Sequence, residues 1–116
     1  MLDIFFKFLL TLKMYHWNTL SYARHKASDD CFGKILDLLD TFIEAMLGKY
    51  GTESVFDKYV LKIGDIHISS DKEMVQQILE FSKFLERLDI QESELLNIRD
   101  EMLSNIEKTM YLFTLK

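Results

Sequence analysis

Asp40 and Glu44 are two carboxylates four residues apart, in a segment whose apolar residues recur at helical spacing. Residues four apart share one face of an α-helix, and here that face lies at the edge of the apolar stripe, beside Ile43 and Leu47. A carboxylate at such an edge is costly to remove from water unless a cation accompanies it. The pair therefore indicates either a cation site or an ordinary solvated helix edge, and its spacing leaves both open.

Two histidines and a third acid precede this pair. His16 falls within the apolar stripe of residues 3–20, His25 follows nine residues later, and Asp29 comes four residues after His25. Taken singly, His16 is typical of a core histidine that donates to a backbone carbonyl, and His25 of a surface residue. Imidazole combined with carboxylate suits iron, zinc or manganese better than calcium or magnesium. The combination predicts a metal site on two consecutive helices, with these ligands: His16, His25, Asp29, Asp40 and Glu44.

Apolar spacing near 3.6 residues predicts the helices that carry these residues. The first spans residues 3–20 and is apolar around most of its circumference, so we expect it to be buried. A short connection, residues 21–27, leads to a second helix capped by Ser28 and ended by Gly51. Residues 52–70 form a long connection in which residues 54–60 could make one or two turns. A capping box at Ser70 and Glu73 opens the third helix, and a break at residues 89–93 precedes the fourth, which extends to residue 113.

Length and composition limit the class of protein. A chain of 116 residues fits one domain, and the absence of proline together with only four glycines disfavours an all-β fold. Its single cysteine, Cys31, excludes an internal disulfide and a zinc–thiolate cluster, which favours a reducing, cytoplasmic compartment. The apolar run of residues 4–12 is interrupted by Lys7 and too short to span a bilayer, so no membrane association is expected. The net charge of -5 opposes binding to nucleic acid.

The histidine and acid pattern resembles the Dps-like branch of the ferritin superfamily, which oxidises and stores iron. The run Tyr15-His16-Trp17-Asn18 matches the family's His-Trp pair late in the first helix. The intervals from His25 to Asp29, from His25 to Asp40 and from Asp40 to Glu44 are four, fifteen and four residues, as in the family. The interval from His16 to His25 is shorter than the family's. The chain is also similar to a short ferritin-like family associated with large DNA viruses and phages, which would place it in a virion or host cytoplasm.

This resemblance implies a fold, a cofactor and a partner. The fold is a ferritin-like four-helix bundle over residues 1–116, with a long crossover between the second and third helices. The site is a dinuclear iron centre shared by a two-fold dimer, with the histidines on one subunit and Asp40 and Glu44 on its mate; zinc or manganese are alternatives. A ferroxidase of this kind uses peroxide or oxygen to oxidise Fe(II), and the family's dodecameric shells imply a homo-oligomer.

Two other functions remain open at the level of sequence. The first is a non-catalytic helical interaction module or virion component that keeps the fold without the chemistry. The second is a DNA-coating protein, which the acidic balance disfavours. Three further residues have structural interpretations: Trp17 as core filling, Cys31 as a small buried hydrophobe and His67 as a surface residue. The methionines are expected to fill gaps in the core or at interfaces.

Overall fold

The structure is a computed structural model that describes residues 1–52, 55–56, 64 and 66–116. Within these residues it contains four α-helices and no strand, which confirms the predicted all-α helical bundle. The helices are α1 (Leu2–Asn18), α2 (Tyr22–Tyr50), α3 (Asp71–Glu86) and α4 (Ser93–Leu112). None of the helices that the structure describes is both long enough and apolar enough to cross a membrane.

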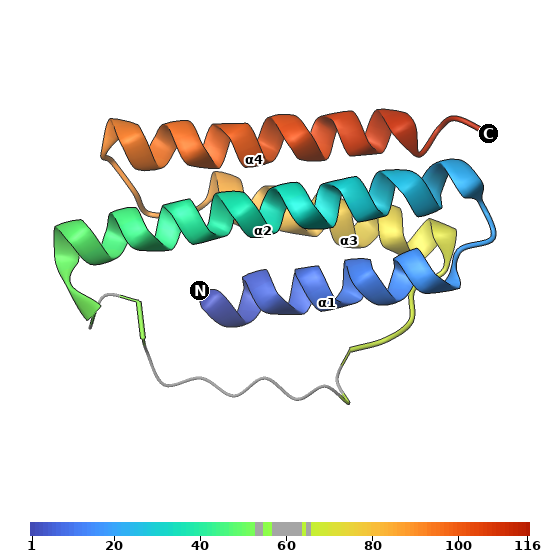
Figure 1. The fold of residues 1–116 in the computed structure, drawn as a ribbon, viewed down its shortest axis with the longest axis horizontal. Coiled ribbons are helices and arrows are strands. Elements are labelled where there is room, and N and C mark those ends of the chain that lie inside the picture. The colour runs from blue at the N-terminus through green and yellow to red at the C-terminus, as the bar shows by residue number, and fades with distance from the viewer. Residues whose placement is uncertain (53–54, 57–63, 65) are drawn as a thin grey trace.

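Each helix packs against two others. Helix α1 contacts α2 and α3, and α4 contacts the same two helices, so α1 and α4 lie diagonally across the bundle. Figure 1 shows α1 and α4 running in one direction and α2 and α3 in the other, so that every packed pair is antiparallel. Because α3 begins beside the start of α2, the link between these two helices must return the chain to that end of the bundle.

Aromatic side chains fill the centre of the bundle. The Phe5 ring is fully buried and meets the edges of Phe81 and Phe84 at centroid distances of 5.5 and 5.4 Å. Phe8 stacks on Phe81 with centroids 3.9 Å apart. These contacts join α1 to α3, while Phe42 packs beside Phe5 and ties α2 into the same core.

A guanidinium group joins the four helices at one end of the bundle. Arg24 of α2 donates from Nη1 to the Tyr15 hydroxyl at 3.1 Å and to the Asp71 carbonyl at 3.0 Å. Its Nε donates to the Phe113 carbonyl at 3.2 Å, and its guanidinium lies 4.9 Å from the centre of the Phe113 ring. Tyr15 in turn donates to the Asp71 carboxylate at 2.7 Å. This network fixes the end of α1, the starts of α2 and α3, and the segment just after α4.

The predicted connection at residues 21–27 is wrong. Helix α2 begins at Tyr22 with Ser21 as its N-cap, and the Ser21 hydroxyl accepts a hydrogen bond from the Arg24 backbone N–H. Ser28, the expected cap, is fully buried inside the helix. The C-terminal prediction is confirmed, since Gly51 ends α2 with a φ of 82°.

The predicted capping box of α3 is present, with Ser70 and Glu73 each accepting from the other's backbone N–H. Helix α3 ends at Glu86, slightly before the predicted break. The suggested turns at residues 54–60 fall largely outside the described residues.

Burial of the first helix is only partly confirmed. Its inner face is buried, but the apolar stripe is wider than two neighbouring helices can cover. Four large side chains of α1 are therefore exposed by 36–70%: Ile4, Phe6, Leu10 and Trp17. The core-filling role predicted for Trp17 is wrong, since its side chain is the most exposed of the four.

Candidate functional site

The two histidines lie face to face across the turn between α1 and α2. His16 belongs to the last turn of α1 and His25 to the first turn of α2, and residues 19–21 reverse the chain between them. Their rings stack with centroids 3.9 Å apart and planes inclined by 19°. His16 is 8% exposed and His25 is half-buried, so the structure brings these two predicted ligands together in a partly dry environment.

Each histidine is held by the backbone of the other. His16 Nδ1 lies 2.7 Å from the His25 carbonyl oxygen, and His25 Nδ1 lies 2.8 Å from the His16 carbonyl oxygen. A carbonyl oxygen can only accept, so Nδ1 carries a hydrogen in both rings, and in the neutral form of each ring Nε2 keeps the lone pair. The buried Ser28 hydroxyl donates to the His25 carbonyl at 3.1 Å and steadies this arrangement. The prediction of a carbonyl-bonded His16 is confirmed, and its tautomer leaves Nε2 free to bind a metal.

Asp29 lies near the histidines but already has a cation. Its Oδ1 accepts from Lys13 Nζ at 2.9 Å. This hydrogen bond, and then the Lys13 charge, hold the pKa of Asp29 below its ordinary value, with smaller contributions from His16 and His25. Lys13 Nζ also lies 4.8 Å from the centre of the Phe32 ring. Asp29 would therefore have to exchange its lysine partner before it could bind a metal.

Asp40 and Glu44 are exposed on α2, far from the histidines of the same chain. Fifteen residues separate His25 from Asp40, and at 1.5 Å per residue the helix places them about 22 Å apart. Among the described residues of a single chain, no group of three or more His, Cys, Asp or Glu could hold a metal ion. A single chain therefore carries two separated halves of the predicted site.

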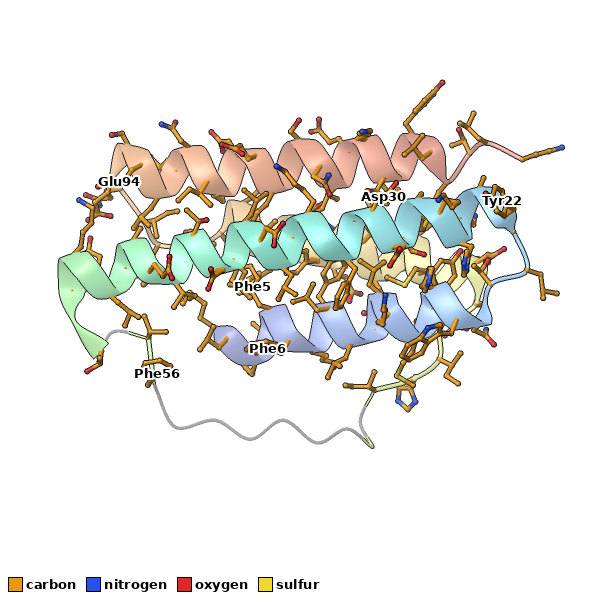
Figure 2. The ribbon with its side chains drawn as sticks, in the orientation of Figure 1. Phe5, Phe6, Tyr22, Asp30, Phe56 and Glu94 are labelled. Carbon is orange, nitrogen blue, oxygen red and sulfur yellow. The ribbon has the colours of Figure 1, made fainter. Side chains whose placement is uncertain are left out.

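The acidic half borders an apolar groove between α1 and α2. The groove has a volume of about 450 Å³ and is lined by Asp40 together with Phe6, Leu36 and Ile43, among others. Phe6 and Leu36 are 39% and 40% exposed. In Figure 2, Phe6 lies on the side of α1 away from α4, and the labelled Phe56 lies near the end of α2. Anything that covered this groove would also remove Asp40 from water.

Sequence reasoning missed Lys13 and Ser28, which complete the surroundings of the histidines. Lys13 is three residues before His16, and Ser28 is three residues after His25, so helical spacing places each beside its histidine. This helical spacing is the sequence feature from which both residues could have been identified. Two other residues behave as predicted: His67 is exposed, and Cys31 is 1% exposed, where burial raises the pKa of its thiol to about 11.

Comparison with known proteins gives a family. A family model described as "Family of unknown function (DUF5856)" matches residues 16–113, a range that contains both histidines and both members of the acidic pair. No match to the chain was found among curated proteins, and none among solved structures. Since the matched range covers most of its length, the chain belongs to the DUF5856 family.

Proposed function

We propose that this protein binds and oxidises Fe(II) in a dinuclear site assembled from two copies of the chain. One copy would supply His16 and His25, and the other would supply Asp40 and Glu44. The observation that carries the proposal is the reciprocal bonding of the histidines, in which each Nδ1 is fixed on the other residue's carbonyl. A backbone carbonyl that accepts from one ring nitrogen is the usual support for a histidine that ligates through the other.

The separation of the two halves supports a second copy. Because α2 holds His25 and Asp40 about 22 Å apart, the acids can meet a histidine pair only on another chain. The apolar groove beside Asp40 gives the second copy a surface to cover, and covering it would desolvate a carboxylate. A buried carboxylate requires a cation, which a metal held by the other copy's histidines supplies. Two-fold symmetry would then make two identical sites.

The residues present fit such a centre. Both histidines would bind as neutral nitrogen ligands through Nε2, Asp40 would bridge or chelate, and Glu44 would be a terminal carboxylate. Asp29 is a further oxygen ligand once Lys13 releases it. Two Fe(II) ions held together can give two electrons to peroxide or oxygen in one event. Zinc and manganese share this ligand preference. A reducing compartment such as the cytoplasm, where Fe(II) persists, suits this reaction.

The test uses two complementary double variants, His16→Ala/His25→Ala and Asp40→Ala/Glu44→Ala. Each should fold, lose Fe(II) oxidation and lose stoichiometric Mn(II) binding measured anaerobically by calorimetry. Mixing them through a denaturing and refolding step should restore activity to about a quarter of wild type, since half the dimers are mixed and each has one intact site. The matched control Asp30→Ala/Glu101→Ala removes two exposed carboxylates that lie outside the apolar groove and should keep full activity.

The outcomes separate three situations. Recovery on mixing supports a shared site. Inactive but folded variants that never complement contradict the sharing of ligands between copies. Wild-type protein that holds no metal contradicts the whole proposal.

Wild-type protein without metal would favour the alternative function, a non-catalytic helical interaction module. In a virus, such a module would be a component of the virion. The Lys13–Asp29 ion pair is the observation that supports it, because a cation from the protein itself already neutralises one predicted ligand. In such a module the exposed apolar residues of α1 would contact a different protein. Metal content of the purified chain distinguishes the two functions directly.

A further inference from the structure

A small polar pocket lies along the seam between α1 and α3, away from the proposed metal ligands. Its volume is about 90 Å³. Its lining comes from α1, from the segment just before α3 and from α3 itself: Lys7, Thr11, His67, Ser69, Glu73 and Gln77. On α1, Lys7 is one residue after Phe6 and therefore about 100° around the helix from the apolar groove. A second copy that covered the groove would leave this pocket open.

Two residues that line the pocket carry hydroxyl groups without a hydrogen-bond partner among the described residues. Thr11 is 5% exposed and Ser69 is 3% exposed, and both line the cavity. Elsewhere in the helices, Thr41 and Thr109 satisfy their hydroxyls by donating to the carbonyl four residues earlier. Across the described part of the chain, neither the Thr11 nor the Ser69 side chain makes a hydrogen bond. Both residues line the cavity, so their hydroxyls are available to donate to a group inside it.

Charge determines what kind of group the pocket favours. Lys7 is exposed and, within the described residues, forms no ion pair, so its ammonium is available to the cavity. The pocket also adjoins the N-terminus of α3, where backbone N–H groups favour negative charge. Glu73 is the opposing charge, but its Oε1 accepts from the Ser70 backbone N–H in the capping box. His67 and Gln77 add side chains that can donate.

We propose that this pocket binds a small oxyanion of the phosphate type. Lys7 would supply the charge, Thr11 and Ser69 would donate from their hydroxyls, and Gln77 and His67 would complete the donor set. The volume is about that of three water molecules in the liquid, which suits one tetrahedral anion. The bound group is either a free anion or the terminal phosphate of a monoester whose remainder projects into solvent.

The first test is titration of the full chain with inorganic phosphate at constant ionic strength, followed by calorimetry and by amide shifts of residues 7, 11 and 69. Saturable binding of one phosphate per chain is expected. Lys7→Gln and Thr11→Val should each weaken it about tenfold or more, a difference well above the error of either method. Lys34→Gln, which removes an exposed lysine from α2, is the matched control and should leave the affinity unchanged.

Several results would overturn the proposal. Shifts that grow linearly without saturation indicate nonspecific screening, as does an equal loss in Lys34→Gln. Binding that survives both Lys7→Gln and Thr11→Val locates the anion elsewhere. Lys7 is exposed, so its variant remains informative even if Thr11→Val fails to fold. Titration with glycerol 3-phosphate identifies the source: equal affinity assigns the site to a phosphomonoester, and binding of inorganic phosphate alone assigns it to the free anion.

Discussion

Substitution of Arg24 should destabilise the bundle more than that of any comparable surface arginine, because its guanidinium contacts three other parts of the fold. In Arg24→Ala the Tyr15 hydroxyl and the carbonyls of Asp71 and Phe113 each lose a charged donor. Hydrogen bonds to charged groups contribute about 1.5–3 kcal/mol each when fully buried. The Arg24 side chain is 19% exposed and water can replace part of it, so we expect a total loss of about 2–3 kcal/mol.

Urea unfolding followed by circular dichroism measures this loss, with protein concentration held fixed because the proposed assembly would add to stability. For a chain of this length about 2–3 kcal/mol corresponds to a fall of about 10 °C in Tm. Arg24→Lys keeps the positive charge but not the planar guanidinium group, and its loss in the free energy of unfolding should be about half as large. The m-value should stay constant, since the variant buries the same core.

Arg99 provides the matched control for this prediction. Its side chain is 18% exposed, almost the same as that of Arg24, yet among the described residues it pairs only with the adjacent Asp100, at 3.0 Å. Exposed pairs of this kind contribute about 0–1 kcal/mol, so Arg99→Ala should be nearly neutral. If Arg24→Ala and Arg99→Ala were equally stable, the network at the end of the bundle would have no part in holding the helices together.

Three further predictions follow from particular residues. Burial raises the pKa of the Cys31 thiol from 9.0 to about 11, so the folded state favours the neutral thiol. The resulting contribution to the free energy of unfolding is complete below pH 9 and is lost as the pH rises toward 11. Cys31→Ala should therefore flatten the decline of stability over that pH range, and an unchanged slope would contradict the assignment. Ser21→Ala should cost about 1 kcal/mol by removing the N-cap of α2, whereas Ser28→Ala should leave the helix start intact; urea midpoints and the His25 amide shift test this pair. Light scattering at micromolar concentration should find at least a dimer, and Phe6→Glu, which places a charge beside the apolar groove, should give a monomer; a wild-type monomer would contradict the shared site.

The third and fourth helices could be predicted closely because local signals and packing agree there. Ser70 and Glu73 form a capping box that depends only on their spacing. The stripe that follows is also the face that the bundle buries, with Met74, Ile78 and Phe81 all inside. In such a segment the sequence specifies both the residue at which the helix begins and the face of the helix that is buried.

The start of α2 was missed because hydrogen bonds replace apolar contacts along its first turns. Apart from the small residue Ala27, the residues that face the bundle there are Arg24, His25 and Ser28, whose polarity interrupts the apolar period. Arg24 and His25 bond to carbonyl and hydroxyl groups at the ends of other helices, and Ser28 bonds to the His25 carbonyl of the same helix. Such residues do not contribute to an apolar period, which is why the apolar spacing predicts a cap at Ser28 instead of Ser21.

Helix geometry alone determines how far apart the two halves of the predicted site lie. An uninterrupted helix from Tyr22 to Tyr50 fixes the distance between His25 and Asp40 at about 22 Å, so no rearrangement of side chains could make one chain's halves converge. The face-to-face histidines, in contrast, depend on a three-residue turn whose conformation no periodicity specifies. In the proposed dimer, two-fold symmetry would place Asp40 and Glu44 of one copy, beside the apolar groove, against the histidine pair of the other copy.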